Sequence, residues 1–293
     1  RRLGVVCNGW PPAVGGVQAL AHDLAKEFVG RGHEVFVLCL DTESRRGPDF
    51  ERRRLRSRGL VVDLISYGYA DHDRLARQVR HERMERVAAN WVHRAVLPLV
   101  HVHHATGFGL GIVPAMQGAG AAVLAHMHDH WALCPRGQLW HVDGSACPGP
   151  APDRCADCVA RTWPHLLPSQ GALAIGPADE ALRDDAEACL HRTSFALEML
   201  RRADHVVACS DSLALRFARH GLDMVHAVAN GVRATELSAE VALRRMDRRD
   251  DGTRTVQDDP AHDPARGSHV RRHPARGRGE DGEVGGAPRA LLP

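Results

Sequence analysis

The pattern of apolar and polar positions divides residues 3–232 into short, nearly continuous apolar runs and intervening stretches with helical spacing. Continuous apolar runs of this length are typical of strands covered on both faces of a parallel sheet. Such runs lie at residues 3–6, 34–40, 60–66, 99–103, 121–125, 205–209 and 225–228. Strands that alternate with helices predict an α/β fold with a Rossmann-like, doubly wound parallel sheet.

Helical spacing is clearest directly after the first strand, where four apolar residues form one stripe: Val17, Leu20, Leu24 and Phe28. Gly32 ends this helix, because the position after a last turn favours a residue that accepts positive φ. A long charged helix is predicted at residues 72–97. A third helix, capped by Ser210, is predicted at residues 210–221.

A glycine pair stands where the first strand gives way to the first helix. Gly15 and Gly16 lack a Cβ, so backbone N–H groups there can approach a ligand, and the helix N-terminus adds partial positive charge. The loop therefore predicts an anion-binding site, and a tight turn without a ligand is the alternative. Its spacing is not the six-residue glycine fingerprint of dinucleotide binders, which argues against a nucleotide-dependent oxidoreductase.

Two histidine-rich turns follow predicted strands, at residues 101–104 and 126–131. Open α/β sheets bind ligands at the carboxyl ends of their strands, and imidazole can exchange hydrogen bonds with a hydroxyl group near neutral pH. Two other interpretations stay open. The histidines are solvent-facing loop residues, or His126, His128 and His130 bind a metal ion together with Asp129.

The eight cysteines form two groups. One group lies in predicted strands or helices and is expected to be buried: Cys7, Cys39, Cys189 and Cys209. The other group crowds a loop insertion, residues 134–160, and ends in a Cys-x-x-Cys knuckle: Cys134, Cys147, Cys155 and Cys158. Four thiolates so close in sequence suit a structural zinc ion that pins the loop. Disulfides and free thiols are the alternatives, and a reducing cytosol disfavours disulfides.

The formal net charge of +2 favours no particular partner. A predicted loop after the second strand is strongly basic, with Arg45, Arg46, Arg52, Arg53, Arg54, Arg56 and Arg58. Contact with anionic lipid or an acidic acceptor is one interpretation, and a solvated loop is the other. Phe50 is the single aromatic in this stretch, which argues against nucleic-acid binding. The sequence shows no transmembrane run and no signal peptide, so we expect a cytoplasmic protein, with peripheral contact at the inner membrane face as an option.

The composition changes abruptly after residue 232. Residues 233–293 are dominated by Arg, Asp, Gly and Pro and hold few aliphatic residues. Such a segment buries too little surface to offset its ordering entropy, so a disordered low-complexity tail is expected. Out-of-frame translation of GC-rich DNA is a second explanation. The chain begins with Arg rather than Met, so we expect that the natural start lies upstream.

Four segments, in order, resemble the amino-terminal domain of family-4 retaining glycosyltransferases, which have two facing Rossmann-like domains called the GT-B fold. They are Pro11-Pro12 with Gly15-Gly16-Val17, residues 101–104, residues 126–131, and residues 203–210 running on to Asn230-Gly231-Val232. The resemblance spans residues 3–232. It implies hexosyl transfer, with retention, from a nucleotide-sugar to a sugar or lipid-linked acceptor.

The resemblance also implies roles for particular residues. His128 and Asp129 match the family's catalytic His-Asp pair, and His104 matches a turn that lines the acceptor side. The residues assigned to donor or acceptor binding are Gly15, Gly16, Val17, His104 and Asn230.

In this family a second domain supplies a basic pair and two spaced glutamates near the donor. No such motif follows residue 232. The sequence thus predicts an acceptor-side half, inactive alone, that lacks its second domain. A non-catalytic, zinc-stabilised interaction module is the alternative.

Overall fold

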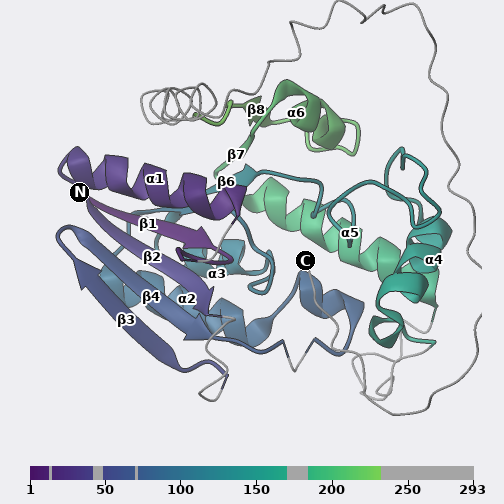
Figure 1. Cartoon of the computed structure of the whole chain (residues 1–293), viewed down its shortest axis with the longest axis horizontal. Coiled ribbons are helices and arrows are strands. Elements are labelled where there is room, and N and C mark those ends of the chain that lie inside the picture. The colour runs from purple at the N-terminus through teal and green to yellow at the C-terminus, as the bar shows by residue number, and fades with distance from the viewer. Residues whose placement is uncertain (13–14, 42–48, 70–71, 170–183, 232–293) are drawn as a thin grey trace, which may run out of the picture. The chain divides into compact units, whose positions relative to one another are not determined.

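The computed structural model describes residues 1–12, 15–41, 49–69, 72–169 and 184–231. The tail expected at residues 233–293 therefore lies outside the described residues, as do Val14, Arg45 and Arg46. The described strands form one sheet in the order β3-β4-β2-β1-β5-β6-β7-β8, and every pairing is parallel except that of β3 with β4. The α/β fold with a doubly wound parallel sheet is confirmed (Figure 1). The strands are β1 (Arg2–Cys7), β2 (Glu34–Asp41), β3 (Arg52–Ser57), β4 (Leu60–Ser66), β5 (Leu99–Val102), β6 (Ala122–Met127), β7 (His205–Ala208) and β8 (Val225–Ala227).

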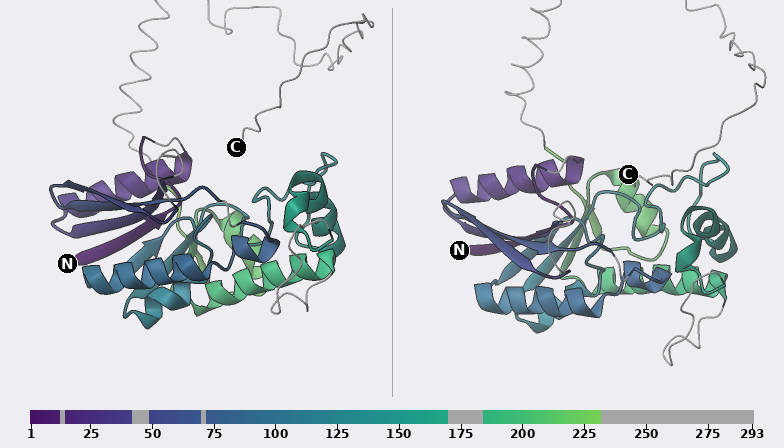
Figure 2. Two further views of the ribbon diagram at one scale, coloured as in Figure 1. Left: turned by 90° about the horizontal axis from the view of Figure 1, so that it is seen from below. Right: turned by 60° about the horizontal axis from the view of Figure 1, so that its bottom comes forward.

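Helices cover both faces of this sheet. They are α1 (Gly16–Gly30), α2 (Glu82–Ala95), α3 (Ile112–Gly118), α4 (Pro152–Thr162), α5 (Asp185–Arg202) and α6 (Asp211–Ala218), with 3-10 turns η1 (Leu75–Gln78) and η2 (Pro164–Leu166). Helix α1 lies on one face, and α2, α3 and α5 lie on the other (Figure 2). None of the described helices is long and apolar enough to cross a bilayer.

The period of two along each strand separates two apolar cores. On β1, Val6 packs with α2, α3 and α5 in the larger core, whereas Val5 and Cys7 face α1 in the smaller one. Two predicted helix boundaries are confirmed. The Oγ of Ser210 accepts a hydrogen bond from the Leu213 N–H at 3.2 Å, and Gly32 takes a φ of 84° after α1.

The basic stretch is not a loop, as the sequence pattern suggested, but contains the edge strand β3. Arg54 lies directly opposite Asp63 of β4 in the antiparallel pair, and Arg52 points to the same face. Both guanidinium groups donate two hydrogen bonds each to Asp63, at distances between 2.7 and 3.0 Å. The buried Asp63 carboxylate is thus the partner of Arg52 and Arg54, and the pattern of residues along the basic stretch does not reveal it.

Two other boundaries differ from the sequence prediction. The long charged helix is shorter, because η1 comes first and His81 then caps α2, its Nδ1 accepting from the Met84 N–H. The cysteine loop contains helix α4, which begins with Pro152 at its first position, where the missing N–H of proline costs nothing. Cys155 and Cys158 therefore lie on a helix and not in a knuckle.

The strand order reverses at β1. The chain first builds outward from β1 through β2 and β4, and then returns to the other side of β1 as β5 before it adds β6, β7 and β8. Consecutive crossovers therefore diverge between the carboxyl ends of β1 and β5, which is where open α/β sheets bind ligands. The His103 N–H donates to the Val6 carbonyl at 2.8 Å and holds these two ends together.

Replacing Asp63 is expected to destabilise the fold. Its side chain is fully buried, so Asp63→Ala removes the acceptor of two guanidinium groups, each about one-third exposed. We expect the free energy of unfolding, measured with urea, to fall by about 2–4 kcal/mol, somewhat below the range for a fully buried pair. Glu27→Ala breaks an exposed pair with Arg31 on α1 and should cost about 0.5 kcal/mol or less. Equal losses in the two variants would contradict this account of β3.

Candidate functional site

The glycine loop leaves the N-terminus of α1 open. Gly16 is exposed, and a Cβ placed on it would meet no atom within 4 Å. Gly15 precedes the helix in extended backbone and offers no side-chain cap to the first-turn N–H groups, and a Cβ there would overlap the Gln18 amide. The Nε2 of Gln18 donates to the Oδ1 of Asn8 at 3.1 Å and ties the helix to the end of β1. The N–H groups at this helix end are thus not sealed beneath packed side chains.

Val17 has a different place from the two glycines. Its side chain packs against the smaller core beneath α1, so only its backbone N–H belongs to the open helix end. Asn230 follows β8 and is exposed, at the edge of the sheet, three strands from β5. The strand order therefore places the end of β1, which leads into the glycine loop, beside the end of β5, whereas Asn230 follows a strand at the sheet edge.

Four histidines form a stack at the ends of β5 and β6. They are His101, His103, His126 and His128. The rings of His101 and His103 have centroids 3.9 Å apart, and those of His126 and His128 lie 4.0 Å apart. The Nε2 of His101 is 3.3 Å from the Nδ1 of His126, and the Nδ1 of His103 is 3.2 Å from the Nε2 of His128. Neighbouring rings are thus paired across the two strands.

Burial keeps these imidazoles neutral. Desolvation, with the proximity of the other rings, lowers the pKa of His101 to about 3 and that of His103 well below its usual value. Desolvation alone lowers the pKa of His126 to about 4. For His128, desolvation and the neighbouring His126 and His104 outweigh Asp129 and lower the pKa to about 3. At neutral pH the stack therefore carries no charge.

A hydrogen-bonded pair, His104 and Asp129, lies beside the stack. The Nε2 of His104 is 3.1 Å from the Oδ2 of Asp129, and the Oδ1 of Asp129 accepts from the Trp131 N–H at 2.8 Å. Burial would raise the pKa of Asp129, but the His104 bond, the Trp131 N–H and nearby His130 lower it below its usual value. The Asp129 side chain is 45 % exposed, so a ligand can reach this carboxylate. The partner of Asp129 is thus His104 and not its neighbour His128.

Arg192 supports the turn that carries Asp129 and Trp131, and the sequence did not predict this role. This α5 side chain is fully buried and donates to the carbonyls of Trp131 at 2.6 Å and Ala132 at 3.0 Å. Its Nε donates to the Oε1 of Gln78 at 3.2 Å, and its guanidinium lies 5.1 Å from the centre of the Trp131 ring. Desolvation lowers its pKa to about 10, which still leaves a cation at neutral pH. A signal existed, because Arg192 falls at helical spacing among the buried residues of α5.

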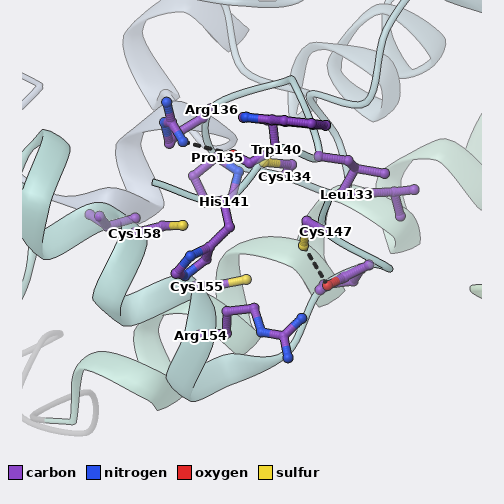
Figure 3. Close-up of a pocket in the computed structure, with 14 residues that line it drawn as sticks. Leu133, Cys134, Pro135, Arg136, Trp140, His141, Cys147, Arg154, Cys155 and Cys158 are labelled. Atoms are coloured by element: carbon purple, nitrogen blue, oxygen red, sulfur yellow. Dashed lines mark hydrogen bonds between the residues drawn. The ribbon is translucent and has the colours of Figure 1, made fainter. Parts of the chain in front are cut away.

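The four clustered cysteines line one pocket. Cys155 and Cys158 come from α4, and Cys134 and Cys147 come from the preceding loop, with His141 among them (Figure 3). The Sγ of Cys147 donates to the Gly149 carbonyl at 3.2 Å. Burial, together with the other three thiols, raises the pKa of Cys155. Within the described ranges, however, only His101, His103 and His126 bring three ligand atoms within 4.8 Å of one another. The four cysteines therefore share a pocket, but no three of their sulfur atoms lie that close together.

The remaining cysteines follow the sequence prediction of burial with one difference. Cys7, Cys39 and Cys189 are buried, and desolvation raises the pKa of Cys7 to about 11 and that of Cys189 to about 12. Cys209 is only partly buried, because it follows the last residue of β7, and its Sγ donates to the His128 carbonyl at 3.6 Å.

Comparison with known families finds one match in this region. Residues 14–151 match the family model described as Glycosyltransferase Family 4, and this segment contains the glycine loop and both histidine-rich turns. The match covers slightly less than half of the chain, and this part of it is similar to glycosyltransferase family 4. The resemblance seen in the motifs is thereby confirmed. A search of curated proteins gives no match.

Solved structures of GT-B glycosyltransferases are similar to this chain at low identity. A trehalose-phosphate synthase from Burkholderia vietnamiensis matches with 14 % identity and a TM-score of 0.47, over 85 % of this chain and 51 % of its own. HepE from Anabaena, in complex with UDP, matches with 13 % identity and a TM-score of 0.40, over 84 % and 49 %. The E. coli protein bound with UDP-2-fluoro glucose matches with 12 % identity and a TM-score of 0.42, over 85 % and 55 %. The chain thus spans about half the length of these structures.

Removing the Arg192 guanidinium should loosen the turn that carries Asp129. Arg192→Met leaves the Trp131 and Ala132 carbonyls without donors in a buried place, at about 1–3 kcal/mol for each unsatisfied group. We expect the free energy of unfolding in urea to fall by about 2–4 kcal/mol. The matched control is Arg202→Met, which breaks an exposed pair with Glu198 on the same helix and should cost less than about 1 kcal/mol. If the Arg192→Met variant is as stable as the control, the supporting role is refuted.

Proposed function

We propose that this chain supplies the acceptor-side domain of a retaining glycosyltransferase, which transfers a hexosyl group from a nucleotide-sugar to a sugar or lipid-linked acceptor. The observation that carries the proposal is the His104–Asp129 pair at the carboxyl ends of β5 and β6, in which the Asp129 carboxylate is accessible to a ligand. The family match over residues 14–151 supports the reaction class. The strand-order reversal at β1 brings the open end of α1 near the same edge of the sheet.

The pair has the chemistry needed to hold a sugar acceptor. Asp129 is a carboxylate whose two oxygens already accept from His104 and the Trp131 N–H, and each oxygen has a further lone pair for an acceptor hydroxyl. His104 orients this carboxylate, because its Nδ1 in turn accepts from the Thr106 N–H at 3.3 Å. In this proposal Asp129 and His104 contact the acceptor. His128, a neutral ring next to Asp129 in sequence, contributes at most a hydrogen bond and no positive charge.

The donor side needs groups beyond this pair. Glycosyl transfer builds negative charge on the leaving diphosphate, which preorganised donors must stabilise. The open N–H groups of Gly16 and the first turn of α1 are suited to one end of that diphosphate. The basic pair that the resemblance assigns to a second domain is not found in the part of the chain that the structure describes. We therefore propose that this chain binds an acceptor but does not turn over a nucleotide-sugar by itself.

Changes at the pair should weaken acceptor binding. We expect Asp129→Asn and His104→Ala to raise the Kd of the full chain for bound hexoses or hexose phosphates about tenfold, because one charge-assisted hydrogen bond is lost. Saturation-transfer NMR with a panel of these sugars measures this. Glu51→Gln and His205→Gln change an exposed carboxylate and an exposed imidazole elsewhere and should leave binding unchanged. Sugar binding that is indifferent to Asp129 would overturn the acceptor role.

The same preparation tests the second half of the proposal. A radiolabelled UDP-glucose assay with the full chain should show no transfer to any sugar in that panel. Turnover by this chain alone would show that it holds the donor-side groups as well.

We further propose that the four clustered cysteines bind a structural zinc ion. Cys155 and Cys158 lie three residues apart on α4, so both thiols project from one side of the helix toward the loop that carries Cys134 and Cys147. A metal ion would draw these sulfur atoms together and release protons from the thiols. The ion would thereby fasten the loop and α4, which packs on α5, to the domain.

Loss of two ligands should abolish this zinc site. We expect the purified chain to contain zinc with sulfur ligands, detected by X-ray absorption, and the double variant Cys155→Ser/Cys158→Ser to lose that sulfur-bound zinc. Cys209→Ser removes a partly buried cysteine outside the pocket and should keep it. Four freely alkylated thiols in the native protein, without sulfur-bound zinc, would contradict the proposal.

A further inference from the structure

The register of β5 and β6 places three histidines on one face of the sheet. Val102 lies beside Ala125, and both side chains enter the larger core together with Val100. Successive side chains of a strand point to opposite faces. His101 and His126 therefore face the side on which α1 lies, and His103 continues the alternation just beyond β5.

The three rings are close enough to share an ion. One nitrogen from each of His101, His103 and His126 lies within 4.8 Å of the others. Nitrogens bound to one tetrahedral zinc at about 2.0–2.1 Å lie roughly 3.3 Å from one another. Small rotations of the rings about their side-chain bonds would close the remaining distance. No strand has to shift for this to happen.

A second observation is independent of this spacing. The side chains of His103 and His126 are 1 % and 4 % exposed, and the Nε2 atom of each is buried without a hydrogen-bond partner. An unsatisfied polar atom in such a place destabilises the fold, so native proteins rarely keep several together. The described hydrogen bonds of the stack join histidine to histidine, and none supplies a partner for these two atoms. Ligation to a cation would give them one.

We propose that His101, His103 and His126 bind a single divalent transition-metal ion, Zn²⁺ or one of similar chemistry, on the α1 side of the sheet. Neutral imidazole nitrogens select such ions, whereas Mg²⁺ and Ca²⁺ require oxygen ligands. Three protein ligands leave a fourth position for water or for His128, whose ring lies 4.0 Å from that of His126. The ion joins the carboxyl ends of β5 and β6, from which the turns bearing His104 and Asp129 emerge. This site is separate from the cysteine pocket and does not depend on the proposed function.

Cobalt binding to the full chain tests the site without a substrate. The chain is produced without a polyhistidine tag, as the Cys155→Ser/Cys158→Ser variant, stripped with a chelator and titrated with Co²⁺. We expect one equivalent to bind with visible ligand-field bands, with no thiolate-to-cobalt charge-transfer band, and to be displaced by Zn²⁺. In this background, His101→Gln and His126→Gln should each raise the Kd for Co²⁺ at least about 100-fold, the upper end of what loss of a mere supporting partner costs. The control His205→Gln, an exposed histidine at the start of β7, should not change it.

A second measurement tests the proposal on the unmutated chain, in case the histidine variants do not fold. X-ray absorption of the zinc-loaded, unmutated chain should show a shell with imidazole nitrogens in addition to any sulfur shell from the cysteine pocket. The proposal is overturned if the Cys155→Ser/Cys158→Ser variant binds no Co²⁺, or if folded His101→Gln and His126→Gln variants bind Co²⁺ with unchanged Kd. It is also overturned if the zinc in the unmutated chain has sulfur ligands alone.

Discussion

The whole site depends on the point at which the strand order reverses. Because β5 returns to the free side of β1, the turns after these two strands leave the sheet side by side while their crossovers diverge. The hydrogen bond from the His103 N–H to the Val6 carbonyl fixes this juxtaposition beyond the last paired residues. The open end of α1 and the histidine-rich turns are therefore neighbours by topology. No side chain has to bring them together.

The register of β5 with β6 then determines the environment of each histidine. Along β5 and the residues that follow it, the alternation places His101 and His103 in the stack, whereas His104, one residue further on, pairs with the accessible carboxylate of Asp129. Desolvation makes the first group neutral, with the pKa of His101 lowered to about 3. Asp129 behaves in the opposite way, since its hydrogen bonds favour the charged form. The two turns thus supply both an uncharged, buried imidazole cluster and an accessible carboxylate at the rim.

The sequence predicted the parts of the fold that depend on residues close together in the chain. Apolar runs located seven of the strands to within a few residues, because a strand covered on both faces must be apolar throughout. It missed β3, whose arginines are stable in an edge strand only because Asp63 lies across the pair. It also missed α4, where cysteine, glycine and proline in the surrounding loop concealed the helical spacing. For β3, the deciding contact is one that periodicity within the segment does not contain.

In the candidate site, too, the sequence located the segments but did not reveal the contacts between them. Strand-end position predicted the two histidine-rich turns, and the resemblance singled out His104, His128 and Asp129 within them. Neither paired these residues, because the partner of Asp129 is set by how two neighbouring strands are aligned. Arg192 is separated by about sixty residues from the carbonyls that it holds. A buried guanidinium is costly unless its donors are satisfied, and here backbone carbonyls and Gln78 satisfy it without a carboxylate. That arrangement leaves Asp129 free of an arginine partner. Its carboxylate therefore keeps lone pairs for an acceptor hydroxyl, which an ion pair at this position would have occupied.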